Sequence, residues 1–173
     1  MELARVAVST DVGRLLELAA LAREELSAER GGSTWAVREA SPEPRDHELR
    51  HAIEDAETMV QVGSFDDYVV GFGIARMEWL RSGECLAVVS DLYVEPAFRE
   101  LAVGEAVMDG LIAWARERGC CGIDSLVLPG MRMSKNFFER YGMKARALLV
   151  HLPLPPEGAA AFGGQDAESA TPR

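Results

Sequence analysis

Apolar residues recur along the chain at two different spacings, and the spacing predicts which segments are helical. They fall three and four residues apart within Val12–Leu26, and again from about Leu101 to Arg118, as expected for helices that bury one face. Ser9–Asp11 offers side-chain oxygens that can cap the first of these helices. Asp46–Glu57 predicts a second, more polar helix, and Ser134–Arg140 predicts a short one.

Six other runs, rich in Val, Ile, Leu, Phe and Met, predict extended strands. These runs are Leu3–Val8, Thr58–Gly63, Tyr68–Trp79, Cys85–Val94, Gly122–Leu128 and Met143–Leu152. Gly71 and Gly73 interrupt the third run, which indicates a bulge or the close approach of another part of the backbone. The order of strands and helices is typical of a mixed α/β domain.

Two segments show neither the helical nor the strand pattern of apolar residues. Gly31-Gly32 predicts the end of the first helix, and Trp35–Asp46, with its prolines, predicts a loop. After Pro153 the composition shifts to Pro, Gly, Ala and Ser, as in disordered tails. The 173 residues suit a single hydrophobic core. We therefore expect one domain over residues 1–152 and a disordered tail over residues 153–173.

The charge balance narrows the classes of partner. A formal net charge of -10 argues against binding nucleic acid or an anionic membrane, because both would be repelled. It mildly favours cationic small molecules such as amines, although an acidic balance also simply keeps a protein soluble. Met1–Thr10 does not resemble a signal peptide, and no run of about 18 apolar residues predicts a membrane span. The predicted location is the cytoplasm.

The cysteines and histidines do not form a recognisable metal or disulfide pattern. Cys85, Cys120 and Cys121 are odd in number and lack zinc-ligand spacing, so we expect buried free thiols and no metal. His47 and His51 lie four apart on the polar helix, where a solvated face is the expected environment.

A candidate anion site lies where the strand that ends at Val94 leads into the long helix. The first turn of a helix has unpaired N–H groups and a partial positive charge. Small residues at Ala102, Gly104 and Ala106 would let an anion approach this backbone, and Arg99 adds a cation at the entrance. The pattern favours a site for phosphate or diphosphate.

Two motifs in this half of the chain resemble those of one enzyme family. Asp91-Leu-Tyr-Val-Glu-Pro, followed by Arg99 and Gly104, resembles the central motif of the GNAT superfamily of N-acetyltransferases, Arg/Gln-x-x-Gly-x-Gly/Ala. Ser134-Lys-Asn-Phe-Phe-Glu-Arg-Tyr-Gly-Met resembles the second signature of that family, Phe-Tyr-Glu followed by Gly-Phe. The resemblance extends from about residue 69 to residue 152.

The resemblance implies a fold, a co-substrate and a chemistry. The fold would be a twisted, mostly antiparallel sheet of six to seven strands, with helices on both faces and Cys85–Val94 splayed from Gly122–Leu128. Acetyl-CoA would be the co-substrate, and an amine would attack its thioester directly. Its pantetheine arm would bind the backbone of Leu92, Tyr93 and Val94. Its diphosphate would bind at Arg99, Glu100, Leu101, Ala102, Val103, Gly104 and Glu105.

The chain departs from the family pattern at several positions. Glu100 and Ala102 stand where the family usually has glycine, and Met131 stands where relatives often have Asn. Phe138 replaces the tyrosine that many relatives use to protonate the departing thiolate. Tyr141 is the candidate acid in its place, or it only packs.

More than one residue is also a candidate for accepting the proton of the amine. Asp91, at the centre of the motif strand, is the candidate base, or it holds a turn or a backbone amide. Glu78 and Glu84, on the neighbouring hairpin, could act through water. The acceptor pocket is expected to be lined by the first two predicted helices, the loop between them near Trp35, and Tyr68–Trp79.

Two functions follow as hypotheses. One is an N-acetyltransferase that modifies a primary amine of a small molecule or peptide; the other is a catalytically silent module of the same fold that binds acyl-CoA or a protein. A dinucleotide-binding site is set aside because Gly71-Phe-Gly73 lies inside a strand. The resemblance is also compatible with a homodimer, in which Met143–Leu152 would pair across the interface.

Overall fold

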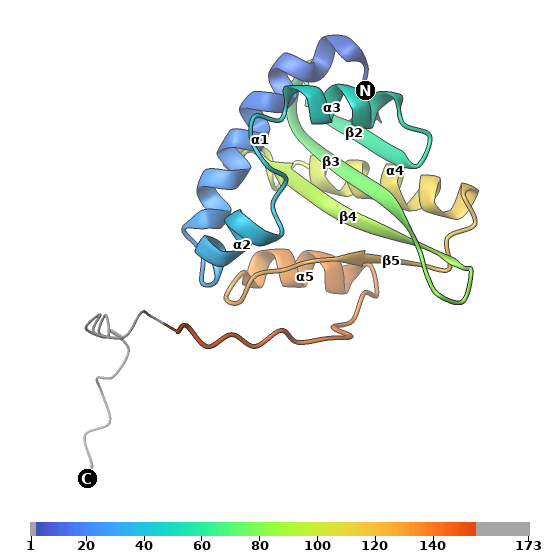
Figure 1. Ribbon diagram of the computed structural model, residues 1–173. Helices are drawn as coiled ribbons and strands as arrows, with labels where there is room; N and C mark the ends of the chain where they lie inside the picture. The colour runs from blue at the N-terminus through green and yellow to red at the C-terminus, as the bar shows by residue number, and fades with distance from the viewer. Residues whose placement is uncertain (1–2, 155–173) are drawn as a thin grey trace.

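One mixed sheet with helices on both faces forms the core of the protein (Figure 1). The computed structural model describes residues 3–154. The sheet order is β1-β2-β3-β4-β5; the first four strands are antiparallel, and β5 runs parallel to β4. The strands are β1 (Ala4–Val6), β2 (Thr58–Phe65), β3 (Tyr68–Trp79), β4 (Cys85–Val94) and β5 (Gly122–Ser125).

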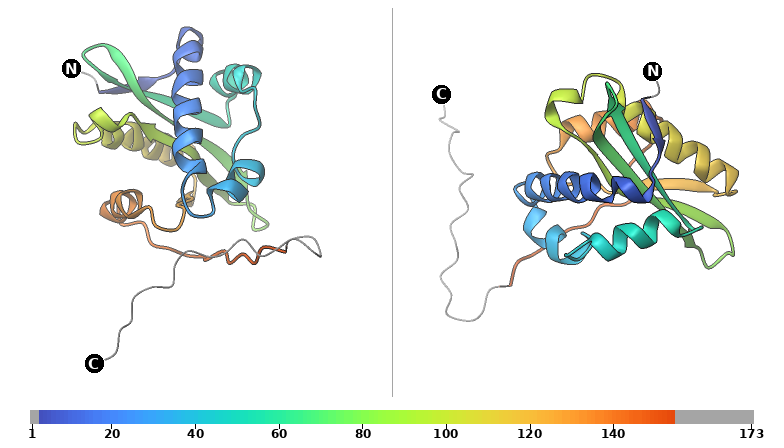
Figure 2. Two further views of the ribbon diagram at one scale, coloured as in Figure 1. Left: turned by 90° about the vertical axis from the view of Figure 1, so that its left-hand side faces the viewer. Right: turned by 90° about the horizontal axis from the view of Figure 1, so that it is seen from above.

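The helices divide between the two faces of this sheet (Figure 2). They are α1 (Val12–Ser27), α2 (Gly32–Arg38), α3 (Asp46–Glu54), α4 (Val103–Glu117) and α5 (Arg132–Arg140), with short 3₁₀ turns at Ser9–Asp11 and Pro96–Phe98. Leu15 and Leu18 of α1 pack with Leu49 of α3 on one face. Met108 and Leu111 of α4 pack on the other face together with α5. The predicted helices on both faces are therefore confirmed.

Glycines let α4 lie directly against the sheet. A Cβ added to Gly63 on β2 would stand 2.5 Å from Val103 Cγ1, and one added to Gly73 on β3 would stand 2.8 Å from Val107 Cγ1. Both features expected from the glycines of β3 are present: the backbone oxygen of Tyr93 would stand 2.8 Å from a Cβ added to Gly71, and the register shifts between Ile74 and Ala75. The close contacts at Gly63 and Gly73 are made by side chains of α4. These contacts fix the depth at which the start of α4 stands beside β4.

The strand count of six to seven is wrong for the described residues, which contain five strands. Met143–Leu152 has no strand partner among residues 3–154 and runs along the rim of the molecule (Figure 1). The strand predicted over Gly122–Leu128 ends at Ser125, and the first strand is shorter than predicted. A run of Val and Leu favours an extended backbone, but a strand also needs a neighbouring backbone to pair with.

The loop predicted from Trp35 onward is wrong at its start, because the chain forms α2 there. Gly31 adopts φ 80°, and Gly32 lies so close to α1 that an added Cβ would stand 2.1 Å from the carbonyl oxygen of Leu26. The glycine pair therefore ends α1 and also starts the next helix. No helix within residues 3–154 is long and apolar enough to cross a membrane.

Candidate active site

The two parallel strands at the centre of the site separate part-way along their length. β4 and β5 pair from Leu86 and Gly122 as far as Val89 and Ser125. β5 ends there, and within the described residues β4 continues to Val94 without a strand partner on that side. One backbone edge of β4 is therefore open where the splay was predicted, and we keep the name splay for this opening.

The ladder between β3 and β4 determines which backbone groups face this opening. The N–H of Glu95 donates to the carbonyl of Val70 on β3, at 2.9 Å. Since antiparallel residues alternate in direction, Tyr93 also directs its backbone groups toward β3, whereas Leu92 and Val94 direct theirs into the splay. Arg99 Nε donates to the carbonyl of Val94 at 2.8 Å, which agrees with this alternation.

The start of α4 faces the same opening with unpaired donors. The backbone N–H groups of Val103, Gly104 and Glu105 have no hydrogen-bond acceptor within the described residues, as expected for a first helical turn. Ala102, directly before the helix, adopts φ 59° and ψ 10°, the left-handed conformation that glycine adopts most readily. The loop therefore has a backbone conformation suited to the glycine of the family motif, although it carries a methyl group.

A groove of about 200 Å³ joins the splay to the start of α4. It is lined by Glu25, Leu26, Leu92, Tyr93, Val94, Arg99, Gly104, Glu105, Met131, Met133, Ser134, Phe137, Phe138 and Arg140. Six of the ten residues predicted to bind the cofactor are among them. Of the other four, Glu100 and Leu101 line an adjoining hollow, Val103 is buried in the core, and Ala102 is exposed.

Ion pairs occupy the mouth of the groove. Arg99 Nη2 donates to Glu25 Oε2 of α1 at 2.6 Å, and its guanidinium lies 5.5 Å from the ring centre of Tyr93. Arg140 of α5 pairs with Glu105 at 2.9 Å. Burial and the charge of Glu25 raise the pKa of the Tyr93 hydroxyl. Glu25 could not be predicted from the sequence, because nothing in the pattern of α1 distinguishes this glutamate from the others in the helix.

Asp91 lies on β4 at the splay and is held by Arg45, the residue directly before α3. Arg45 Nη1 donates to Asp91 Oδ1 at 2.7 Å, and Nη2 donates to Oδ2 at 3.3 Å. Ser90 Oγ adds a third hydrogen bond at 2.8 Å. Three donors therefore hold this carboxylate in place.

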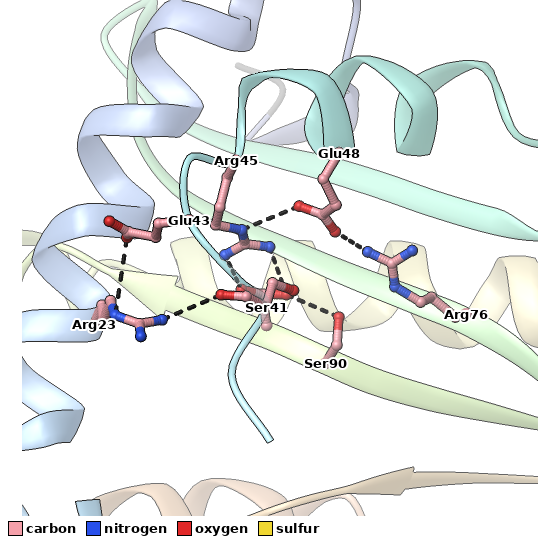
Figure 3. A network of polar contacts seen from close by, with 8 residues as sticks. Arg23, Ser41, Glu43, Arg45, Glu48, Arg76 and Ser90 are labelled. Carbon is pink, nitrogen blue, oxygen red and sulfur yellow. Dashed lines mark hydrogen bonds and ion pairs between the residues drawn. The ribbon is translucent and has the colours of Figure 1, made fainter. Parts of the chain in front are cut away.

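Arg45 joins this carboxylate to a larger network. Its side chain is 8% exposed, and its Nε donates to Glu48, which also pairs with Arg76 of β3 (Figure 3). Burial by itself lowers the pKa of Arg45, but the hydrogen bond and charge of Asp91 outweigh this effect and the pKa is raised. Arg45 therefore stays charged, as a buried partner of Asp91 must.

The same network fastens residues 39–45 over the centre of β4. Arg23 of α1 donates to the carbonyl oxygens of Ala36 at 2.6 Å and Ser41 at 3.1 Å, while Arg45 anchors the other end of the segment (Figure 3). The first two helices and this segment therefore form the wall that faces the splay. Arg45 could not be found from the sequence, because 46 positions separate it from Asp91.

The other two candidate bases lie farther from the splay. Ile74 pairs with Asp91, whereas Glu78 pairs with Leu86, near the closed end of the hairpin. Four residues of strand place Glu78 roughly 13 Å away along the sheet. Glu84 is exposed in the turn before β4 and accepts a hydrogen bond from Ser82.

Tyr141 ends α5 with its hydroxyl directed at α4. The hydroxyl lies 3.1 Å from both the carbonyl of Glu105 and Asp109 Oδ1, and Tyr141 does not line the groove. Burial, together with Asp109, raises its pKa to about 12, which makes it a weaker acid. This geometry favours the packing alternative. The groove-lining aromatic at the signature position is Phe138, which has no proton to donate.

The three thiols occupy different environments. Cys85 is buried, as predicted, whereas Cys120 is only half-buried and Cys121 is exposed. Cys85 Sγ and Cys120 Sγ are 3.1 Å apart as free thiols, and burial raises the pKa of Cys120 to about 11. His47 and His51 are both exposed on α3. Residues 3–154 contain no group of three or more metal-ligating side chains.

Comparison with known families adds an independent observation. The family model described as "Acetyltransferase (GNAT) family" matches residues 18–143, which include the splay, the start of α4 and α5. The chain belongs to the GNAT family of acetyltransferases. The motifs read at Arg99–Gly104 and Ser134–Met143 therefore identified the family correctly. No curated protein sequence matches the chain.

Solved structures share the GNAT fold over most of the chain. A variant of the BH1408 protein of Bacillus halodurans is 18% identical, with a TM-score of 0.72 over 87% of this chain and 99% of that one. An acetyltransferase of Trypanosoma brucei is 20% identical, with a TM-score of 0.61 over 87% and 98%. AAC(6')-Iy, solved with a bisubstrate analogue of CoA and acetylneamine, is 14% identical, with a TM-score of 0.66 over 88% and 97%.

Proposed function

We propose that this GNAT protein transfers an acetyl group from acetyl-CoA to a primary amine of a small molecule or peptide. One observation carries the proposal. The unpaired edge of β4 opens onto the unpaired N–H groups at the start of α4, within a single groove. This arrangement offers a strand edge to an amide-containing arm and a helix start to a diphosphate.

The groove residues fit the two ends of acetyl-CoA. The backbone groups of Leu92 and Val94 would pair with the amides of the pantetheine arm, as a neighbouring strand would. The N–H groups of Val103, Gly104 and Glu105 would donate to the diphosphate. Arg99 stands beside them and would exchange Glu25 and the Val94 carbonyl for the phosphates. Glu100 is exposed, so its carboxylate need not oppose the phosphates.

The chemistry needs little from side chains. The amine nitrogen attacks the thioester carbon, the C–S bond breaks, CoA leaves as its thiolate, and the new amide nitrogen loses a proton. A thiol with a pKa near 8.5 is a fair leaving group, so the reaction does not depend on an acid at Tyr141. Asp91 is the nearest candidate base, and its bonds to Arg45 also suit it to position the wall of the acceptor site.

The occupied mouth of the groove favours a second candidate function. Arg99 and Arg140 already have carboxylate partners, and Phe138 provides no acid. A catalytically silent acyl-CoA-binding or protein-interaction module of the same fold would have these features. AAC(6')-Iy was solved with an analogue that joins CoA to acetylneamine, and another structural neighbour is a ribosomal-protein-alanine N-acetyltransferase of Brucella melitensis, so small-molecule and peptide amines both belong in the test.

The test measures binding and turnover separately. Purified protein is mixed with acetyl-CoA and a panel of polyamines, aminoglycosides, amino acids and peptides, and free thiol is followed. We expect acetyl-CoA to raise the unfolding temperature and one amine class to release thiol. A thermal shift without thiol release supports the silent module; the absence of both overturns the proposal.

A variant tests the phosphate site directly. Gly104→Asp places a carboxylate at the start of α4, and we expect acetyl-CoA affinity to fall at least about tenfold, or about 1.4 kcal/mol, in calorimetry. Gly13→Asp is the matched control, because Gly13 lies in the first turn of α1, away from the groove, with open space around it. Equal affinity of the two variants would show that the diphosphate binds elsewhere. The cytoplasm remains the predicted location.

A further inference from the structure

Two of the three thiols meet at the closed end of the β4–β5 strand pair. Cys85 begins β4, and Cys120 lies in the connection between α4 and β5. Their Sγ atoms are 3.1 Å apart, although 35 positions separate the two residues in sequence. Neither cysteine lines the groove. The fold therefore brings two nucleophilic sulfurs together at a place that the proposed acetyl transfer does not use.

Backbone contacts hold these two cysteines where a covalent bond could join them. The N–H of Cys121 donates to the carbonyl of Cys85 at 2.7 Å, so Cys120 is one residue away from a position that is hydrogen-bonded to Cys85. The N–H of Cys120 donates to the carbonyl of Ala115 at 2.9 Å, which attaches the same segment to the end of α4. To reach the length of a disulfide bond, the two sulfurs need to approach by only about 1 Å.

The pair combines a protected thiol with an accessible one. Cys85 is 4% exposed, whereas Cys120 is half-buried. A small oxidant can therefore reach Cys120 from solvent, and Cys85 then stands beside it as the second thiol. Burial raises the pKa of Cys120 to about 11, which slows its attack on an oxidant because the thiolate is the reactive form.

Other uses of Cys120 fit the structure less well. Residues 3–154 contain no group of three or more side chains that could hold a metal ion. The neighbouring Cys121 is a poor partner, because adjacent residues hold their Cα atoms only about 3.8 Å apart, below the range that disulfides prefer. Cys121 is also exposed whereas Cys85 is buried, so the side chains of these two lie in different environments.

We propose that Cys85 and Cys120 form a reversible disulfide when the protein meets a low-molecular-weight disulfide such as oxidised glutathione. The thiolate of Cys120 attacks one sulfur of the small disulfide, whose S–S bond breaks, and one small thiol leaves. The sulfur of Cys85 then attacks the sulfur of Cys120, and the second small thiol leaves. Two protein thiols are thereby oxidised, the small disulfide is reduced, and the two protons pass to the leaving thiolates.

The new bond would join the start of β4 to the end of α4 without reaching the groove. β4 and β5 pair from Leu86 and Gly122, directly beyond the two cysteines. Leu92, where β4 enters the groove, lies roughly 23 Å from Cys85 along the strand. A disulfide restricts the unfolded chain, so oxidation should stabilise the protein and leave acetyl-CoA binding unchanged. The site does not depend on acetyl-CoA chemistry, so it stands or fails apart from the proposed function.

Thiol counting in a variant of the full chain tests the proposal. Cys121→Ser removes the exposed thiol and leaves Cys85 and Cys120. After incubation with oxidised glutathione, a thiol-reactive dye in denaturant should find neither thiol, and mass spectrometry should show the loss of two hydrogen atoms with no bound glutathione. Trypsin places Cys85 within residues 82–99 and Cys120 within residues 119–132, so the bond should link two peptides that dithiothreitol separates.

Cys120→Ser is the matched control, because it keeps Cys85 together with the exposed Cys121 and should form no internal disulfide. Circular dichroism should show that both variants are folded. Oxidised Cys121→Ser should unfold at least about 5 °C above its reduced form, and dithiothreitol should reverse the shift. Retention of both thiols in Cys121→Ser, glutathione adducts without an internal bond, or equally fast internal oxidation of Cys120→Ser would each overturn the proposal.

Discussion

Single residues decide how closely this chain follows the backbone that a GNAT phosphate loop requires. Ala102 holds φ at 59°, where its Cβ crowds the following carbonyl group, and it does so on the surface, where packing does not compel it. Asp91 and Arg45 are buried instead of exposed: their side chains are 15% and 8% exposed, and the opposite charges of the two compensate each other. Both positions lie next to the groove, so their energetics bear on the site.

Replacing Ala102 with glycine should stabilise the protein. The left-handed conformation costs alanine about 1–2 kcal/mol, and the greater freedom of unfolded glycine offsets part of this gain, leaving about 1 kcal/mol. Urea unfolding would show a higher midpoint for Ala102→Gly. Ala106→Gly, inside α4, is the control and should lower stability by about 1 kcal/mol. A lower midpoint for both variants would contradict the strain at Ala102.

Replacing Asp91 with asparagine should destabilise the fold whether or not Asp91 is a base. The change leaves the buried Arg45 without its charged partner, at a cost of about 2 kcal/mol or more. Chemical unfolding measures this loss. Asp46→Asn removes a carboxylate from an exposed pair with Arg50 and should leave the midpoint almost unchanged, because water screens that pair. Equal effects at the two positions would contradict a role for Asp91 in the network.

At the scale of elements, the site depends on how α4 is held between the sheet and α5. Gly63 and Gly73 let the helix approach β2 and β3, and Tyr141 attaches the end of α5 to the first turns of α4. The start of α4 carries the unpaired N–H groups, so these contacts set the position of the predicted phosphate site.

The contact between α5 and α4 predicts a dependence on alkaline pH. The pKa of Tyr141 is raised from 10 to about 12 in the folded state, so the folded protein keeps a proton that the unfolded chain loses. The stabilisation is present below pH 10 and is lost as pH rises toward 12. The free energy of unfolding should therefore fall more steeply over this interval in the original chain than in Tyr141→Phe.

Cys120 is half-buried and its pKa is raised to about 11, so its thiol also makes stability fall at alkaline pH. The effect of Tyr141 is therefore measured as the difference in slope between the original chain and Tyr141→Phe. Tyr68→Phe, at an exposed tyrosine of β3, is the control and should keep the slope of the original chain. If Tyr141 instead donates a proton to the departing thiolate, Tyr141→Phe will lower kcat more than it changes KM for acetyl-CoA. An unchanged slope and a reduced kcat together would contradict the packing role.

At the scale of the whole molecule, the buried residues of the described core clusters lie between Ala7 and Phe138. Both faces of the sheet are covered by helices up to α5, and residues 144–154 contribute no buried side chain. The domain predicted over residues 1–152 should therefore fold without the residues that follow.

A chain ended at Leu154 should unfold with a free energy within about 0.5 kcal/mol of the original, because the change removes none of the packed residues described above. Thermal and urea unfolding of the two chains at equal concentration make the comparison, since dimer formation would otherwise raise apparent stability. A loss of several kcal/mol would show that residues 155–173 pack on the domain.

The sequence predicted the elements that carry their own signal. β4 has the predicted bounds of Cys85–Val94, and α4 begins and ends within about two residues of its predicted limits. Turn residues and apolar periodicity are local properties, so they can be read without the fold. The family and the splay followed from motif residues that lie close together in sequence.

The tertiary structure alone decided which distant residues meet. Arg45 reaches Asp91, Glu25 reaches Arg99, and the hydroxyl of Tyr141 turns to α4, each across a sequence separation that no local pattern encodes. It also decided that Met143–Leu152, which has the composition of a strand, finds no strand partner in the part of the chain that the structure describes, because strand formation depends on a second backbone. Local propensity determined where the helices and strands of this protein form. Long-range packing determined which charged side chains meet at its site.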